Sequence, residues 1–194
     1  MKHKVHLADL QQKKGEPTPY YVVEPFQLSS SPQFPNALVW LEQPLDLVQF
    51  PEVLSAAVLL ASPSCRVHLS CLTGPPSIPI VGPLVRRVGP HRALEYLLAG
   101  VELSAEEAFQ ARLIDGVMSA EAFETWINQV LVLSPQSQEL AFEMVQLQRF
   151  ASQSAAEAAE RYGFALAFAL PDAAEGIKAF LDKRHPHFRM KNEE

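Results

Sequence analysis

The first candidate for chemistry is a short segment that holds both cysteines of the chain, Cys65 and Cys71, with His68 midway between them. A zinc site would need further ligands beside this Cys-x2-His-x2-Cys spacing, so no metal site is predicted. A nucleophilic cysteine needs a base and an electropositive environment. Because residues three apart on a strand point to opposite faces, His68 is not expected to serve Cys71. Cys71 is therefore a candidate nucleophile without an evident base.

The charge of the chain is unevenly distributed around a formal net charge of −6. Residues 101–175 hold twelve acidic residues and three arginines, whereas residues 178–191 hold five lysines and arginines. The net charge argues against non-specific binding to nucleic acid. The basic C-terminus is either a solvated tail, which charge alone favours, or a contact for an anionic ligand.

Length and composition limit the class of protein. The 194 residues, 48% hydrophobic and 20% charged, suit one soluble domain with a substantial core. No apolar run reaches the ~18 residues that a membrane span needs. Residues 1–6 are basic but have no apolar segment behind them, so a secretory signal is not expected. Two cysteines six residues apart suit a reduced, cytoplasmic chain.

The prolines divide the chain into regions. Thirteen of the sixteen prolines fall in residues 1–90. Residues 1–36 are predicted to form a Pro-rich, loosely structured arm, because closely spaced prolines forbid a long helix. A core over residues 37–134 and a helical C-terminal region over residues 135–194 are expected to follow.

Four segments predict short strands in the first half of the chain. They are residues 20–23, 36–41, 55–61 and 66–72. The segment 55–61 is a continuous apolar run, which indicates a strand buried on both faces. The segment 66–72 alternates polar and apolar residues, which is typical of a half-buried strand.

Capping signals predict helices from residue 90 onward. Pro90 suits the first turn of a helix, and Gly100 suits the position just past its end. Ser104 and Glu107 form a capping box for the next helix, which Gly116 is expected to end.

Three more helices are predicted toward the C-terminus. Ser134 followed by Pro135 is expected to start the first of them. Ser154 with Glu157 predicts the cap of an alanine-rich helix, and Asp172 with Glu175 predicts the cap of the last one.

Several of these segments also share motifs with a known family. Residues 84–89 read L-V-R-R-V-G, residues 104–114 read S-A-E-E-A-F-Q-A-R-L-I, and residues 175–188 read E-G-I-K-A-F-L-D-K-R-H-P-H-F. They resemble the motifs L-x-R-x-V-G, S-A-x-x-A-x-x-x-G-L-V and E-G-x-x-A-F-x-x-K-R-x-P-x-F of the enoyl-CoA hydratase/isomerase (crotonase) family. The resemblance covers residues 57–188. It implies an α/β fold: a shortened, crotonase-like ββα spiral with a helical C-terminal half.

The resemblance also implies a ligand and partners. In the family the last helix supplies an aromatic residue and a lysine that cover coenzyme A; here these match Phe180 and Lys183, with Arg184 nearby. Coenzyme A or phosphopantetheine is therefore expected as part of a substrate, with an acyl-CoA or acyl-carrier protein as partner and no tightly bound cofactor. Crotonases trimerise through the helical half, so a homo-oligomer, or a hetero-oligomer with a related subunit, is expected. The stretch from Gly74 to Gly89 resembles hydratase-like proteins of polyketide β-branching.

The chain also departs from the family's pattern. Crotonases stabilise an enolate with two backbone N–H groups on glycine-rich turns, and this chain has no glycine between Gly15 and Gly74. Its N-terminal part is shorter than the family's. The two positions that match the catalytic glutamates of hydratases are Pro51, with Glu52 adjacent, and Cys71. Glu52 and Cys71 are thus the candidate catalytic residues, although a surface glutamate in a short helix is the simpler interpretation of Glu52.

Two functions follow from this pattern. We expect a crotonase-like scaffold or thioester-binding subunit that has lost hydratase chemistry. The alternative is an active lyase or isomerase that hydrates, isomerises or decarboxylates an acyl thioester through an enolate.

Overall fold

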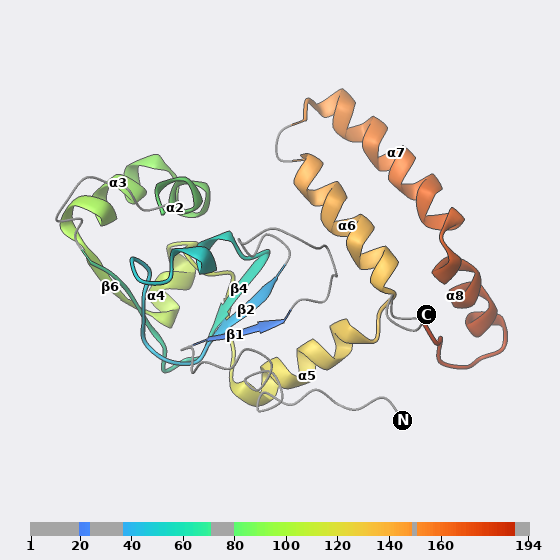
Figure 1. Cartoon of the computed structure of the whole chain (residues 1–194), viewed down its shortest axis with the longest axis horizontal. Helices are drawn as coiled ribbons and strands as arrows, with labels where there is room; N and C mark the ends of the chain where they lie inside the picture. Colours follow the sequence, from blue (N-terminus) through green and yellow to red (C-terminus); the bar gives the residue numbers. More distant parts are fainter. Residues whose placement is uncertain (1–19, 24–36, 71–79, 149–150, 189–194) are drawn as a thin grey trace. The chain divides into compact units, whose positions relative to one another are not determined.

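The computed structural model describes the backbone of residues 20–23 and all atoms of residues 37–70, 80–148 and 151–188. Its described residues form two compact units, one made of residues 20–23, 37–70 and 80–128 and the other of residues 129–148 and 151–188. The first unit contains two small sheets and most of the shorter helices, and the second consists of helices (Figure 1). The predicted α/β fold, with strands in the first half and a helical C-terminal half, is confirmed.

The larger sheet has the order β1-β2-β4-β7, with β1 spanning Tyr20–Val23, β2 Leu38–Leu41, β4 Val58–Ala61 and β7 Gly116–Val117. β1 runs antiparallel to β2, while β4 runs parallel to both β2 and β7. All four residues of β2 are buried because this strand lies between two others. These strands confirm three of the four predicted segments: β1 has the predicted bounds, and β2 and β4 are shorter than predicted.

The smaller sheet has the order β3-β5-β6, with β3 spanning Leu45–Asp46, β5 Arg66–Leu69 and β6 Val101–Ser104. The side chains of β5 alternate between exposed and buried, as predicted. Asp46 pairs with His68, and His68 pairs with Glu102, so these three residues share one face of the sheet.

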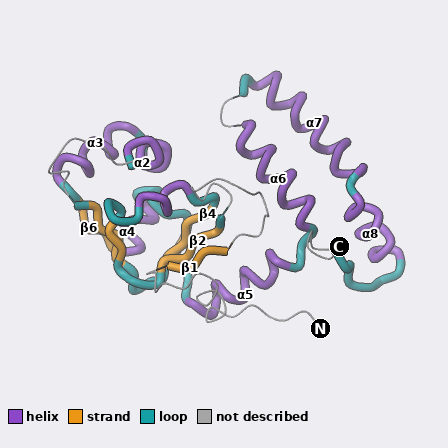
Figure 2. Tube along the Cα trace, viewed as in Figure 1, coloured by secondary structure: helices purple, strands orange, loops and turns teal. Residues whose placement is uncertain are grey.

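The helices of the first unit begin with the short 3-10 helix η1, Pro51–Ser55. They continue with α2 (Val81–Val88), α3 (Pro90–Ala99), α4 (Ala105–Gln110) and α5 (Ala120–Leu131), whose last turn belongs to the second unit (Figure 2). The predicted ends of α3 are confirmed, with Pro90 in its first turn and Gly100, at φ 71°, just past its end. The capping box of Ser104 and Glu107 is also confirmed.

The predicted end of α4 at Gly116 is wrong. The helix ends at Gln110, and Arg112 then takes a left-handed conformation with φ 62°. Gly116 belongs to β7 instead, where a side chain would press against Leu60 at 3.1 Å. The left-handed residue therefore falls where the family motif S-A-x-x-A-x-x-x-G has its glycine, but arginine occupies that position here.

The second unit contains α6 (Pro135–Gln148), α7 (Gln153–Ala169) and α8 (Pro171–Leu181). The start of α6 at Pro135 agrees with the sequence. The capping box predicted at Ser154 and Glu157 is wrong, because Ser152 caps α7 by accepting a hydrogen bond from the Ala155 N–H.

The cap predicted for α8 is wrong as well. The helix has Leu170 at its N-cap and no side-chain cap. The Asp172 carboxylate instead accepts a hydrogen bond of 2.6 Å from the hydroxyl of Ser134. Glu175 is used by Arg184, as described below.

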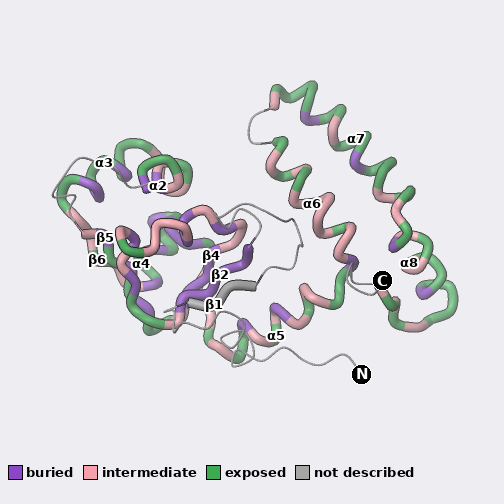
Figure 3. Tube along the Cα trace, in the orientation of Figure 1, coloured by how far each residue is buried: buried purple, intermediate pink, exposed green. Residues whose placement is uncertain are grey.

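Burial differs between the two units (Figure 3). The first unit has a continuous apolar core built from β2, β4, β5 and the helices that pack on them, with Val39, Leu59 and Leu84 completely buried. In α6, α7 and α8 the buried residues are Ala156, Gly163, Asp172 and Ala179. Among the described residues, no helix is both long and apolar enough to cross a membrane.

Candidate functional site

The turn between β3 and η1 lies directly before Pro51, the residue that the family resemblance aligns with a catalytic position. Its four backbone N–H groups, from Leu47 to Phe50, are all engaged. Leu47 donates to the His68 carbonyl oxygen at 2.8 Å, and Gln49 and Phe50 donate to the Asp46 carbonyl oxygen at 3.0 and 3.1 Å. Val48 donates to Oδ1 of Asp46 at 2.9 Å. The chain itself therefore occupies the amide donors of this turn.

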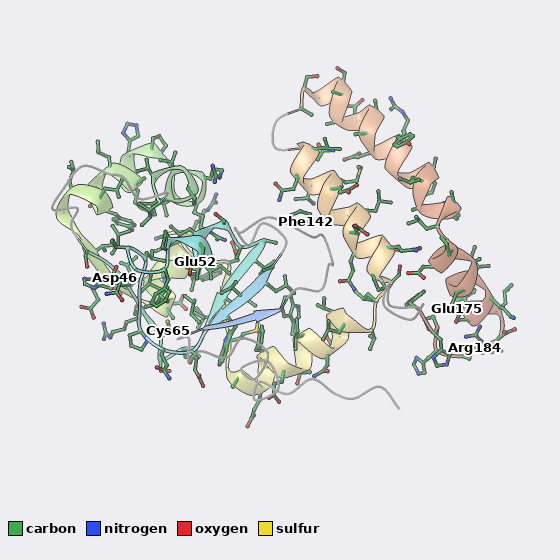
Figure 4. All side chains as sticks on the ribbon, viewed as in Figure 1. Asp46, Glu52, Cys65, Phe142, Glu175 and Arg184 are labelled. Carbon is green, nitrogen blue, oxygen red and sulfur yellow. The ribbon has the colours of Figure 1, made fainter. Side chains whose placement is uncertain are left out.

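Asp46, which is labelled in Figure 4, accepts hydrogen bonds in this turn through both its carbonyl oxygen and its carboxylate. Its Oδ2 atom accepts a hydrogen bond of 2.7 Å from the Ser70 hydroxyl. Burial raises the pKa of Asp46, but the hydrogen bonds from Ser70 and Val48 and the nearby His68 outweigh it, so the pKa lies below its ordinary value. Asp46 thus places a negative charge among these donors at neutral pH.

Of the two candidate catalytic residues, the structure describes Glu52 but not Cys71. Glu52 lies in the first turn of η1 and is half-buried, with Pro51 before it. Cys71 lies outside the described residues, so its role as a nucleophile stays a prediction.

Cys65, the cysteine that the structure describes, lies in the packed core, which favours a structural role. Its thiol is buried and donates to the Gln43 carbonyl oxygen at 3.2 Å. Burial raises the pKa of Cys65 to about 11, which disfavours the reactive thiolate. In the part of the chain that is described, no group of three or more potential metal ligands gathers.

Arg87 of α2 positions η1. Its guanidinium donates to the carbonyl oxygens of Leu54 at 2.8 Å and Ala56 at 2.9 Å, and to that of Leu113 at 3.3 Å. It also pairs with the carboxylate of Asp115 at 3.0 Å. The same Asp115 oxygen accepts the Leu59 N–H at 2.7 Å, so Arg87 connects η1, β4 and the segment before β7. These contacts support the fold.

The predicted coenzyme A contacts lie at the end of α8. Phe180 is 82% exposed, and Lys183 follows the helix with a left-handed φ of 51°. Arg184 turns back and forms a bidentate ion pair with Glu175, with distances of 2.7 and 3.0 Å. Phe180 and Lys183 are therefore presented to solvent, whereas the Arg184 guanidinium already has a carboxylate partner.

Glu175 holds the segment after α8 to the helix. It accepts the bidentate bonds from Arg184 and the His187 N–H at 2.7 Å. The hydrogen bonds from Arg184, followed by that from His187, lower the pKa of Glu175 to about 2.

Replacing Glu175 with Gln is expected to lower thermal stability at neutral pH and to have little effect at about pH 2. The folded-state pKa of about 2 lies below the ordinary value of 4.5. The stabilisation is therefore complete above pH 4.5 and is lost as the pH falls toward 2. Melting curves of both proteins across this range test it, with Asp182→Asn as a control because Asp182 is only a weak partner of Arg184, at 3.4 Å. A difference that persists undiminished at pH 2 contradicts the prediction.

Sequence reasoning missed Asp46 and Ser70. An aspartate two residues before Val48 is a local signal, since aspartate side chains commonly bond the backbone two residues on. The contact with Ser70 has no local signal because 24 residues separate it from Asp46.

The sequence and structure resemble known proteins in a consistent way. The enoyl-CoA hydratase/isomerase family model matches residues 75–191, which is more than half of the chain. The 2,3-dehydroadipyl-CoA hydratase of Escherichia coli is 32% identical over 110 residues, covering 55% of this chain and 43% of that protein. The mitochondrial enoyl-CoA hydratase domain-containing protein 3 of Danio rerio is 33% identical over 141 residues, covering 69% of this chain and 46% of that protein.

A solved structure gives the same result. The crystal structure of an enoyl-CoA hydratase/isomerase from Cupriavidus metallidurans superposes with a TM-score of 0.60 and 27% identity, covering 77% of this chain and 59% of that chain. The chain spans less than half the length of the two curated relatives named above. By its family motifs, its fold and these matches, the chain belongs to the enoyl-CoA hydratase/isomerase (crotonase) family.

Proposed function

We propose that this crotonase-family chain has lost hydratase chemistry and acts as a scaffold or thioester-binding subunit. The observation that carries the proposal is the occupied turn before Pro51. A hydratase must offer free N–H groups to an oxygen that becomes negatively charged. Here the Val48 N–H is bonded to the Asp46 carboxylate, whose negative charge would repel an enolate.

The proposed ligand is an acyl thioester of coenzyme A or of the phosphopantetheine on an acyl-carrier protein. The exposed Phe180 ring and the Lys183 side chain support this ligand class, because an aromatic surface beside a cation suits adenine and phosphate. The sequence between Gly74 and Gly89 favours a carrier-protein thioester from polyketide β-branching as the substrate class. The proposed location of the protein is the cytoplasm. Calorimetry with coenzyme A tests the proposed contact of Lys183 with the ligand. No binding heat, or the same affinity in Lys183→Ala as in the wild type, would refute this contact.

The second unit supports an assembly role. Large apolar side chains are exposed on α7 and α8, among them Tyr162, Phe164, Phe168 and Phe180. Such surfaces commonly mark protein interfaces. We therefore propose a homo-oligomer built on trimers, or a hetero-oligomer with a related, longer subunit, and light scattering of the purified chain with and without such a subunit tests it.

A hydration assay tests the loss of chemistry. The intact chain, incubated with crotonyl-CoA, is expected to leave the enoyl-thioester absorbance unchanged, and a decarboxylation assay with a 3-methylglutaconyl thioester is expected to be negative. Turnover that disappears in Glu52→Ala or Cys71→Ala refutes the scaffold proposal.

The alternative function is an active crotonase-type lyase or isomerase. Two observations favour it: the similarity to proteins that are named as hydratases, and the half-buried Glu52 beside Pro51. A hydratase with Glu52 as its acid or base would show a pH–rate profile that changes in Glu52→Gln.

A further inference from the structure

The cluster around Asp46 is built from two segments that are distant in the sequence. β3 ends at Asp46, and β5 ends at Leu69, directly before Ser70. Parallel pairing of the two strands, with Asp46 opposite His68, fixes their separation. The Val48 N–H and the Ser70 hydroxyl therefore both reach the Asp46 carboxylate, one at each of its oxygens.

We propose that Asp46 is a built-in occupant of an oxyanion cradle formed by the Val48 N–H and the Ser70 hydroxyl. A carboxylate and the oxygen of a thioester carbonyl are both acceptors that suit such donors. The Asp46 side chain is attached to the cradle, so it competes at high effective concentration with any external oxygen. Asp46 is thus an autoinhibitory contact that keeps the donors closed to ligand. Its functional meaning rests on the function proposed above.

Chemical rescue tests the cradle without any thioester. Asp46→Ala leaves the donors without an acceptor and is expected to lower the Tm. Acetate, a carboxylate small enough to replace the lost side chain, is then expected to raise the Tm by about 3 to 6 °C at ten times its Kd. Chloride at equal ionic strength provides the comparison. Wild type and Asp46→Asn, in which a side chain still fills the cradle, are expected to show no such difference between acetate and chloride.

Glu107→Ala is the matched control. Glu107 also accepts a backbone N–H and a serine hydroxyl, both from Ser104, at 2.9 and 2.7 Å. Its carboxylate is exposed, so water hydrates the donors when it is removed, and acetate is not expected to rescue this variant. Rescue confined to Asp46→Ala supports the cradle. Equal response of the two variants, or none in Asp46→Ala, overturns it.

A measurement on the wild-type chain covers the case in which Asp46→Ala does not fold. The Val48 amide resonance is expected to stay unchanged when acetate is titrated at constant pH, because Asp46 occupies this donor. A saturable shift at this amide would mean that the donor is open, which also overturns the proposal. Neither experiment measures hydration, so loss of the cradle and loss of the proposed function can be told apart.

Discussion

Replacing Arg87 with Met is expected to lower the free energy of unfolding by roughly 3 to 5 kcal/mol. The Arg87 side chain is only 11% exposed, and its guanidinium bonds three backbone carbonyl oxygens as well as the Asp115 carboxylate. Methionine keeps most of the apolar stem but removes every donor. The carbonyl groups at the end of η1 would then be left without their partner, and Asp115 would lose its counter-charge.

Arg86→Met is the matched control for this prediction. Arg86 is the neighbouring residue of α2, carries the same charge and is exposed. A surface substitution of this kind usually changes stability by ~0.5 kcal/mol or less. Urea unfolding of both variants, followed by circular dichroism, gives the two free energies. Equal losses in the two variants would show that the guanidinium bonds of Arg87 are not what holds η1.

Local signals explain what could be predicted from the sequence. The ends of α3 depend on Pro90 and Gly100, and the start of α4 depends on Ser104 and Glu107, which are near neighbours in the chain. The strand segments were recognised from runs and alternation of apolar residues. Where two local signals competed, as at Ser152 and Ser154, the sequence alone favoured the wrong serine.

Long-range contacts explain what could not be predicted. Arg87 reaches Leu54, which lies 33 residues away in the chain, and Ser70 reaches Asp46 across 24 residues. A carboxylate at Glu175 gives the same capping signal whether it bonds the helix start or Arg184. The choice between these partners is made by the path of the segment after α8, which no residue pattern near Glu175 records.

The turn before Pro51 shows both what could be predicted from the sequence and what could not. The sequence showed that the turn before Pro51 lacks the glycines of the family. It did not show that the turn is closed by an internal carboxylate. Asp46 satisfies the Val48 N–H without any left-handed residue in the turn, because an aspartate side chain can replace the bond that a sharper backbone turn would make.

The second large effect is expected in the core beside α5. Phe123→Ala is expected to lower the free energy of unfolding by about 3 to 5 kcal/mol, because large-to-small changes in a packed core lose burial and leave a cavity. Phe123 is completely buried and stacks on Trp40, with ring centroids 5.3 Å apart. The centroid of its ring also lies 6.1 Å from that of the Trp126 ring. Tryptophan fluorescence therefore reports unfolding at this place directly, since Trp40 and Trp126 are the two tryptophans of the chain.

Phe164→Ala is the matched control, and it changes the second unit instead of the first. Phe164 is 70% exposed on α7, and its ring meets that of Phe168 edge to face at 5.0 Å. Losing this pair is expected to cost only about 1 kcal/mol in the isolated chain. If Phe164→Ala instead costs as much as Phe123→Ala, and the cost grows with protein concentration, the Phe164 ring is buried between subunits in solution, as the proposed oligomer requires. If Phe123→Ala costs no more than Phe164→Ala at low protein concentration, the Trp40–Phe123 stack is not part of a packed core.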